Sequence, residues 1–422
     1  MTDAIEIALI SDDSGQLNSI SVWDVRNGTQ LMQYRGGGAS HKSTLNVING
    51  KFLVTANNVK PLLNFWALNN SDTIQNIKFV MPARVNCLSV SNDGLYLVAG
   101  IKENIYIWQI STGKMLTMLT KHYQNVNCIK FTDDGSHFVS GGEDGQVIVW
   151  NLSAVIGDRF NTDNIEALHV FSDHALPVTD LWIGIGGLSG LLATSSKDRT
   201  CKIYDMASGT LLLSLVFQEI ITCLTLDRIE TSLFIGTSQG NIYHHRLQPP
   251  PRTREYHITN DDEINNKFKG HTKAITCLAI SLDEQTLLSG SEDFNVIIWN
   301  IQSRSLLKIL PFKGVITNAI FMSSNKVMFN HEEKLELVSK NFQRMISNAD
   351  NKEIVEVVHE MNNEEPENIL QCYTNNNSNN SHKYSRTTRN DTSETNNSKA
   401  ELERLKKVNK ELFDFCAKNV MT

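Results

Sequence analysis

The fold is decided by the stretch HYQNVNCIKFTDDGSHFVSGGEDGQVIVW, which runs from His122 to Trp150. Four side chains in it are separated by 18, 4 and 6 residues, and a later stretch repeats both the residue types and the spacings: His122, Ser140, Asp144 and Trp150, then His271, Ser289, Asp293 and Trp299. Side chains of these types can form one chain of hydrogen bonds that ties a loop to two strands. The repetition therefore predicts a protein built from similar units.

The units recur along most of the chain at a nearly constant period. Their aromatic or aromatic-like anchors are separated by 43, 42, 42, 54, 41 and 54 residues: Trp23, Trp66, Trp108, Trp150, Tyr204, His245 and Trp299. A period of about 40 to 45 residues is typical of the blades of WD-repeat propellers. We therefore expect an all-β protein, a seven-bladed WD-repeat β-propeller over residues 1–340.

A third unit keeps the polar set with Thr and Tyr substituted: His174, Thr194, Asp198 and Tyr204. Two other units lack its aspartate, because Lys102 and Gln239 stand in that place. We expect those two blades to depend on core packing alone. A Ser, His and Asp set also fits a hydrolase, but a catalytic triad occurs once per site and these sets are repeated. The sequence therefore predicts structural struts and no enzyme.

Two intervals are longer than the others because residues are inserted after the anchor strand. The insertions, Asn151 to Glu166 and Pro249 to Asn266, should lie between the third and fourth strands of their blades, on one face of the ring. They form either a shared docking edge or loops without function, since long surface insertions cost little stability. We expect the ring to close by pairing a strand from about Val315 to Val338 with strands before Trp23. The sequence leaves open whether the last segment adds a partial eighth blade.

Composition narrows the possible functions. The chain has 422 residues, 41% of them hydrophobic, a net charge of −7 and a pI near 6.0, which disfavours direct nucleic-acid binding by this protein alone. No apolar run is long enough to span a membrane. Four of the seven cysteines occupy one repeat position on different units, so they are predicted to be buried hydrophobes and not metal ligands: Cys87, Cys128, Cys223 and Cys277. No cofactor is expected.

The composition changes after the propeller. Residues 341–373 carry one weak helical pattern, and residues 374–399 are dominated by Asn, Ser and Thr, which predicts a disordered linker. Residues 400–418 then show a heptad seam, Leu402, Leu405, Asn409, Leu412 and Cys416, typical of a coiled-coil helix. So short a helix needs a partner. We expect a homodimer through it, the alternative being a helix that packs back on the propeller.

Several stretches resemble the animal WD-repeat subunit of the rixosome, and they occur in the same order from the first blade to the last helix. They are Tyr34 to Gly38, His122 to Gln124, Phe131-Thr132, Ser136 to Phe138, Asp173 to Leu181, Phe268 to His271, Lys313 to Ala319 and Asn409 to Phe415. The Asn-rich linker departs from the pattern.

The resemblance implies a nuclear protein of the nucleolus and nucleoplasm, a scaffold acting on pre-60S particles late in large-subunit maturation. Its implied partners are a helical-repeat scaffold rich in proline, glutamate and leucine, and a second helical-repeat subunit. An endoribonuclease and polynucleotide kinase pair would remove the internal spacer of pre-rRNA. The chemistry would belong to these partners.

A second function, from another class, has one sequence cue. Trp23-Asp24-Val25-Arg26 resembles the box by which some propellers dock on the adaptor of a cullin-type ubiquitin ligase. The chain would then be a substrate receptor. Arg26 is equally explained as a solvated residue before the Asn27-Gly28 turn, and copurified partners would separate the two functions.

Overall fold

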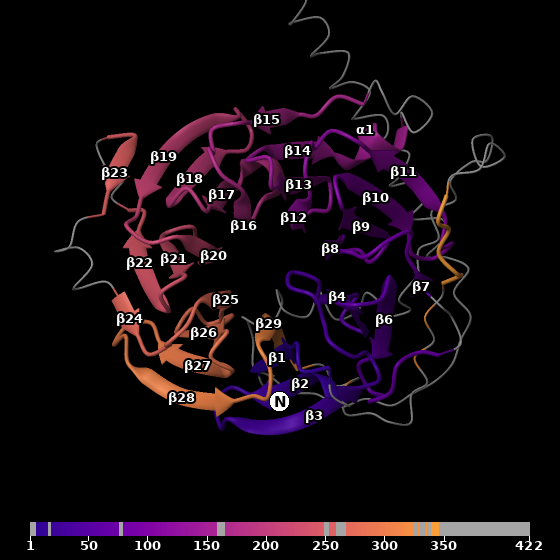
Figure 1. Ribbon diagram of the computed structural model, residues 1–422, viewed down its shortest axis with the longest axis horizontal. Helices are drawn as coiled ribbons and strands as arrows, with labels where there is room; N and C mark the ends of the chain where they lie inside the picture. The colour runs from indigo at the N-terminus through magenta and orange to yellow at the C-terminus, as the bar shows by residue number, and fades with distance from the viewer. Residues whose placement is uncertain are drawn as a thin grey trace, which may run out of the picture. The chain divides into compact units, whose positions relative to one another are not determined.

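The computed structural model describes residues 6–15, 18–75, 79–157, 165–248, 253–258, 267–324, 328, 335, 337 and 339–345. The chain divides after His359 into two compact units, and all the described residues belong to the first. They form seven β-sheets set around a ring, which confirms the seven-bladed propeller (Figure 1). None of the helices in these ranges is long and apolar enough to cross a membrane.

Each blade contains four antiparallel strands, arranged side by side from the ring centre outward. Blade one contains, in that order, β29 (Ile316–Ser323), β1 (Glu6–Asp12), β2 (Asn18–Asp24) and β3 (Thr29–Arg35); blade two, β4 (Asn46–Ile48), β5 (Phe52–Ala56), β6 (Leu62–Ala67) and β7 (Phe79–Val80); blade three, β8 (Cys87–Val90), β9 (Tyr96–Ile101), β10 (Asn104–Gln109) and β11 (Met115–Leu119). All seven anchors predicted from the sequence lie on the third strand of their blade.

The other four blades repeat this plan. Blade four contains β12 (Val126–Phe131), β13 (His137–Gly142), β14 (Val147–Asn151) and β15 (His169–Phe171); blade five, β16 (Val178–Ile183), β17 (Leu191–Ser196), β18 (Thr200–Asp205) and β19 (Thr210–Val216); blade six, β20 (Ile221–Leu226), β21 (Ser232–Thr237), β22 (Asn241–Arg246) and β24 (Lys267–Lys269); blade seven, β25 (Ile275–Ile280), β26 (Thr286–Ser291), β27 (Asn295–Asn300) and β28 (Leu306–Pro311). A 3₁₀ turn, η2 (Gly187–Ser189), precedes β17.

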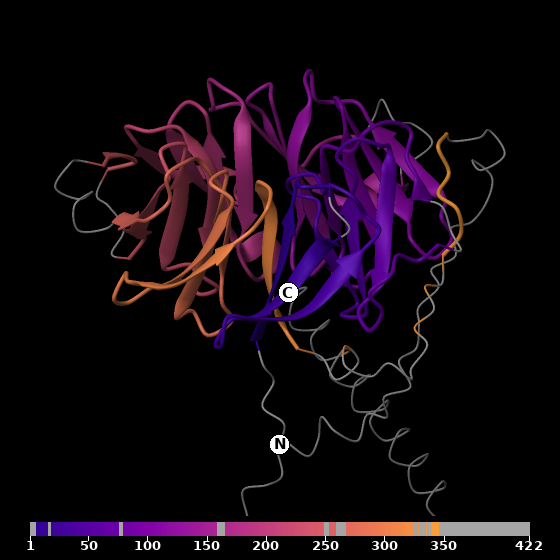
Figure 2. The same ribbon diagram turned by 60° about the horizontal axis from the view of Figure 1, so that its bottom comes forward.

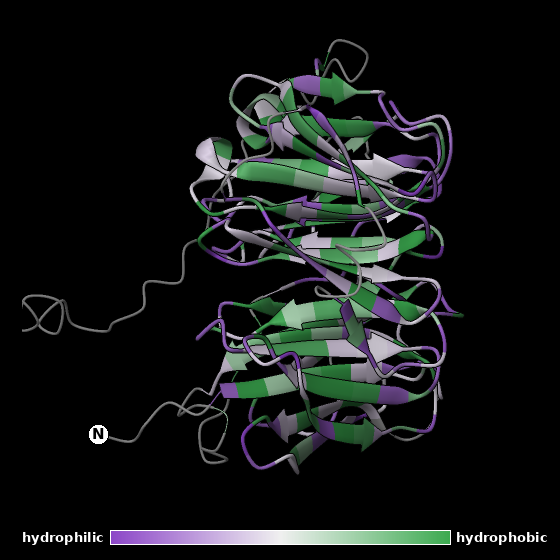
Figure 3. Ribbon diagram, turned by 90° about the vertical axis from the view of Figure 1, so that its left-hand side faces the viewer, coloured by the Kyte–Doolittle hydropathy of each residue, from purple (hydrophilic) through white to green (hydrophobic). Residues whose placement is uncertain are grey.

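The hydrophobic core lies between neighbouring blades. One cluster packs Ile107 of blade three against Phe138 and Trp150 of blade four, and another packs Phe234 of blade six against Trp299 of blade seven. Figure 3 shows apolar segments along the stacked strands and polar segments at many of the turns. A single sheet cannot bury both of its faces, so each blade is stabilised by its two neighbours.

The ring closes in blade one, where the ends of the propeller sequence meet. The strand β29 pairs with β1 in an antiparallel register that sets Ile320 opposite Leu9, and the two strands lie side by side in Figure 2. Blade one is therefore built from strands of both ends of the propeller sequence, which holds the ring closed. Among the described residues, no further sheet forms a partial eighth blade.

Both insertions follow the third strand of their blades, as predicted. The first begins with α1 (Leu152–Gly157), whose Val155 is fully buried beside blade four. The second contains β23 (Glu255–His257), which pairs in parallel with β19, the outer strand of blade five. Part of the second insertion therefore extends the neighbouring blade.

A segment beyond the expected propeller boundary also packs on the ring. This segment, Ser339 to Met345, forms a strap against the outer edge of blade three (Figure 1). Phe342 is 5% exposed and packs between Phe79 of blade two and Trp108 of blade three. The boundary at residue 340 therefore falls inside a packed segment, and most of the expected partly helical extension, residues 346–373, lies outside the described residues.

Candidate functional site

The polar sets of blades four and seven form the same hydrogen-bonded strut. In blade four the ring of His122 bonds Ser140 Oγ through Nε2 at 2.9 Å and Asp144 Oδ2 through Nδ1 at 3.0 Å, and Trp150 Nε1 donates to Ser140 Oγ at 3.0 Å. The corresponding distances in blade seven, among His271, Ser289, Asp293 and Trp299, are 2.7, 2.9 and 2.8 Å.

The aspartate of each strut also fixes backbone. Asp144 accepts from the amides of Tyr123 and Gln146 at 3.1 and 3.0 Å, which joins the loop before β12 to the turn before β14. Burial alone would raise the pKa of Asp144, but the bonds from His122 and these amides hold it below its ordinary value. The carboxylate thus remains charged and bonded near neutral pH.

The strut serine is not placed to act as a nucleophile. The indole N–H can only donate, so Ser140 Oγ accepts from Trp150, and its own hydrogen is then free to point to His122 Nε2. Ser140 and Ser289 are both 0% exposed, and no substrate can approach their hydroxyls. A hydrolase needs this same arrangement at the surface of a cleft.

Blade five differs from the expected chain of bonds at its last member. His174 contacts Thr194 and Asp198 at 2.9 and 3.0 Å, as in the other struts. The hydroxyl of Tyr204, however, donates to Asp173 at 3.0 Å and not to Thr194. A phenol carries its donor at the far end of the ring, beyond the threonine, whereas an indole carries it at the side.

Blade six has a strut of another composition, so the expectation that it depends on core packing alone was wrong. Glu219 accepts from Asn241 Nδ2 at 2.8 Å, from Tyr243 OH at 3.1 Å and from Lys267 Nζ at 3.3 Å, and it also bonds Thr237. Burial would raise the pKa of Glu219, but these donors lower it. The side chains of this strut differ in type from the His, Ser or Thr, Asp and Trp of the family pattern, so that pattern does not predict the strut.

Blade three, where Lys102 replaces the aspartate, is completed by the strap. Trp108 Nε1 donates to the carbonyl of Gln343 at 2.8 Å, and the Gln343 side chain accepts from the amide of Met115 at 3.1 Å. The backbone N–H of Gln343 donates to the backbone carbonyl of Gly113 at 2.9 Å. The indole of this blade is therefore satisfied from outside the blade, which also corrects the expectation of core packing alone.

The four repeat-position cysteines lie on the innermost strands of four different blades, each opposite a glycine of the next strand: Cys87 and Gly100, Cys128 and Gly141, Cys223 and Gly236, Cys277 and Gly290. A Cβ on any of these glycines would lie 2.6 to 2.8 Å from the sulfur. Burial raises the pKa of each thiol. Within the described ranges, no three His, Cys, Asp or Glu side chains converge as a metal ion requires.

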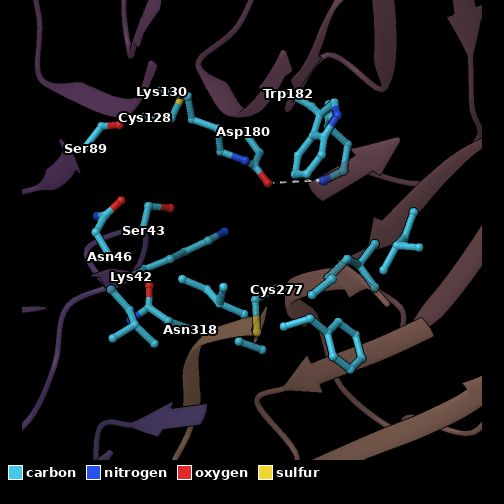
Figure 4. A pocket seen from close by; sticks show the side chains of 18 of the residues that line it. Lys42, Ser43, Asn46, Ser89, Cys128, Lys130, Asp180, Trp182, Cys277 and Asn318 are labelled. Atoms are coloured by element: carbon cyan, nitrogen blue, oxygen red, sulfur yellow. Dashed lines mark hydrogen bonds between the residues drawn. The ribbon is translucent and has the colours of Figure 1, made fainter. Parts of the chain in front are cut away.

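A cavity of about 560 Å³ occupies the ring centre and is walled by the innermost strands of all seven blades (Figure 4). Polar bonds lock neighbouring strands around it: Asn46 Nδ2 donates to Leu88 O at 2.9 Å, Asn127 Nδ2 to Val178 O at 2.9 Å, and Leu224 N to Asp180 Oδ2 at 3.2 Å. Lys42 extends from the loop before β4 into this cavity.

The sequence alone does not predict this cavity. Its charged members, Lys42, Lys130, Asp180 and Arg228, belong to no motif and come from blades two, four, five and six. Only the closed ring brings them together. The repeat period does give one indication of them, because it predicts where the innermost strands lie and each of these four residues falls at or beside such a strand.

Other predicted residues lie outside the described part of the chain. These are the coiled-coil seam, Leu402, Leu405, Asn409, Leu412 and Cys416, and the linker over residues 374–399. The Trp23 to Arg26 box is described: Asp24 accepts from the Arg26 amide at 2.9 Å and from Asn27 Nδ2 at 2.7 Å. This arrangement fixes the turn before β3 and leaves Arg26 exposed.

Comparison with known proteins gives one family model and several relatives that match most of this chain. The model of the WD domain, G-beta repeat, matches residues 113–151, 165–205 and 263–300. These ranges contain the three units for which the sequence predicts a polar set of His, Ser or Thr, Asp and an aromatic residue.

Three relatives are informative. The chain is 41% identical to WD repeat-containing protein 18 of Danio rerio over 330 residues, 78% of this chain and 76% of that protein, and 38% identical to the Homo sapiens protein over 351 residues, 83% and 80%. It is 29% identical to the pre-rRNA-processing protein pro-1 of Caenorhabditis elegans over 330 residues, 76% and 62%.

Proposed function

This chain belongs to the family of WD repeat-containing protein 18, and on that premise we propose that it is a non-catalytic scaffold subunit of the rixosome. It would be needed for late maturation of the pre-60S particle and for processing of the internal spacer in pre-rRNA. The observation that carries the proposal is the likeness, over 76% of this chain, to a relative named for pre-rRNA processing.

The geometry of the propeller supports a scaffold. Its Ser, His and Asp sets are buried struts, and among the described residues four of the five thiols are buried and the fifth, Cys277, is half-buried. Burial of an ionisable nucleophile removes both substrate access and the charged form that reacts. A closed ring instead offers rigid loops and outer strands as surfaces on which other proteins assemble.

The proposed partners are those that the family resemblance implies. They are the helical-repeat scaffold rich in proline, glutamate and leucine, the second helical-repeat subunit, and the endoribonuclease and polynucleotide kinase pair that supplies the chemistry. Pre-60S particles would be the substrate of the assembly, in the nucleolus and nucleoplasm. The net charge of −7 favours contact with RNA through these partners and not through this chain alone.

Depletion of the protein in its own cells tests the proposal. Spacer-containing precursors of the large-subunit rRNA should accumulate on a northern blot, while small-subunit precursors stay near their normal level. The wild-type chain should restore processing. An unchanged precursor pattern after depletion would contradict the assignment.

Affinity purification separates this function from that of a ubiquitin-ligase receptor. The tagged protein should recover the two helical-repeat subunits in fixed ratio together with pre-60S particles. Arg26→Ala, an exposed change in the Trp23 to Arg26 box, should leave that recovery intact. Recovery of a ligase adaptor and a cullin, lost on this change, would support the receptor function instead.

A further inference from the structure

Lys42 is held in the central cavity by a loop with little freedom to move. The side chain of Asn318, on β29, accepts from the Thr44 amide at 3.0 Å and donates to the carbonyl of His41 at 2.8 Å. Thr44 Oγ1 donates to that same carbonyl at 2.6 Å, and Ser43 adopts a positive φ of 56°. Lys42 is thus fixed on both sides by bonds to another blade.

From this loop in blade two, the Lys42 side chain crosses the ring. Its ammonium donates to the carbonyl of Thr222 on β20 of blade six at 3.0 Å. A carbonyl carries only a partial charge, so the ammonium retains most of its attraction for an anion. Figure 4 shows Lys42 inside the cavity, in the space between Asp180 and Asn318.

The cavity carries more positive than negative charge. Lys42, Lys130 and Arg228 line it, with Asp180 as its acidic member. Asp180 already accepts from the amides of Leu224 at 3.2 Å and Leu181 at 2.9 Å. Among the residues that the structure describes, no carboxylate lies within 4.0 Å of any of the three cationic groups, so their charge is available to a ligand.

The same cavity has an apolar side. Lys130 Nζ lies 4.6 Å from the centre of the Trp182 ring, and Leu226, Ile280 and Phe321 complete this part of the wall. A cation on an aromatic face beside aliphatic side chains suits a ligand that carries a carboxylate next to an apolar group. A nucleic-acid backbone would instead need a continuous basic groove.

We propose that the central cavity binds an extended acidic peptide segment of a partner protein. One carboxylate of the segment pairs with Lys42, a second lies at Lys130, and a large apolar side chain packs against Trp182. The volume of about 560 Å³ falls within the range of about 300 to 1,000 Å³ found for ligand pockets. This inference is independent of the proposed role in ribosome assembly.

Fluorescence anisotropy on the full chain tests the site. The probe is a labelled octapeptide that alternates Glu with Leu and Phe, compared with its counterpart in which every Glu is Gln. The Glu peptide should bind about tenfold tighter or more. Lys42→Gln and Lys130→Gln should each weaken its binding by about tenfold, with melting temperatures near that of the parent. Lys121→Gln, a change at an exposed lysine outside the cavity, is the matched control and should bind as the parent does.

Three results would overturn the proposal. One is equal affinity for the Glu and Gln peptides, including no binding of either. Another is the same affinity for the Glu peptide in the two cavity variants as in Lys121→Gln. The third is a short single-stranded RNA that binds in a Lys42-dependent way while the peptide does not, which would assign the site to nucleic acid.

Discussion

At the scale of single residues, the position of one donor atom decides what a side chain stabilises. The indoles of Trp150 and Trp299 reach the serine of their own strut, whereas the phenol of Tyr204 reaches Asp173. All three rings are buried on equivalent strands. Equivalent positions in the repeat therefore give equivalent packing but not equivalent hydrogen bonds.

Asp293→Ala should lower the free energy of unfolding by about 1 to 3 kcal/mol, because it leaves His271 Nδ1 and the amides of Thr272 and Asn295 without their acceptor. Thermal denaturation compared with Glu292→Ala, an exposed neighbouring carboxylate, measures the effect. Equal melting temperatures for the two variants would refute the strut.

Protonation of His244 should weaken the fold in mild acid. Burial, and then the charges of Arg304 and Arg246, lower its pKa to about 4. The unfolded chain, with a histidine pKa near 6.5, binds this proton more readily, so the contribution is complete above pH 6.5 and is lost as the pH falls from 6.5 to about 4. The loss is at most about 3 kcal/mol.

Replacement of His244 by Phe measures this contribution, because Phe keeps the stacking on Phe234, whose ring centre is 4.6 Å away, and cannot be protonated. Between pH 7 and pH 5, the free energy of unfolding should fall less in His244→Phe than in the parent. The matched control is His257→Gln at a largely exposed histidine, which should follow the parent. Parallel curves for His244→Phe and the parent would exclude the effect.

At the scale of elements, two blades depend on segments from outside their own four strands. Blade five is extended by β23, which comes from the insertion in blade six, and blade three is completed by the strap. Each segment covers the outer edge of a sheet, where unpaired backbone would otherwise face solvent. The folded propeller therefore includes two segments in addition to its seven four-stranded repeats, namely β23 and the strap.

Phe342→Ala should destabilise the propeller by about 3 kcal/mol or more, since it removes a buried ring that stacks on Trp108 at 6.0 Å and contacts Phe79 at 4.9 Å. Met345→Ala, at an 82% exposed side chain of the same strap, should leave the melting temperature unchanged. If both variants melted with the parent, the strap would not be part of the folded unit.

At the scale of the whole molecule, seven sheets close into one ring, and a polar C-terminal sequence follows it. The ring has a buried hydrophobic core, and it is closed by the paired strands β29 and β1. The coiled-coil seam near the C-terminus, by contrast, has too few heptads to form a stable helix alone. Self-association is therefore expected to come from the C-terminal sequence and not from the blades.

We predict that the full chain self-associates through this seam. Replacing Leu405 and Leu412 by Asp places like charges in it and should give a monomer with the propeller still folded. Analytical ultracentrifugation of the parent, the double variant and a chain ending after Met345, which retains the strap, measures the mass. A parent that is monomeric at micromolar concentration would assign the helix to another partner or to the propeller surface.

The sequence by itself determined the number of blades and the struts of blades four and seven, because each depends on residues at short, repeated spacings. The tertiary structure alone decided how blade three is satisfied and what lines the central cavity. Trp108 and Gln343 are 235 residues apart, and Lys42 and Thr222 are 180 apart. Such contacts exist only once distant segments have folded against one another, since no local spacing in the chain encodes the bond from blade three to the strap or the bond of Lys42 across the ring.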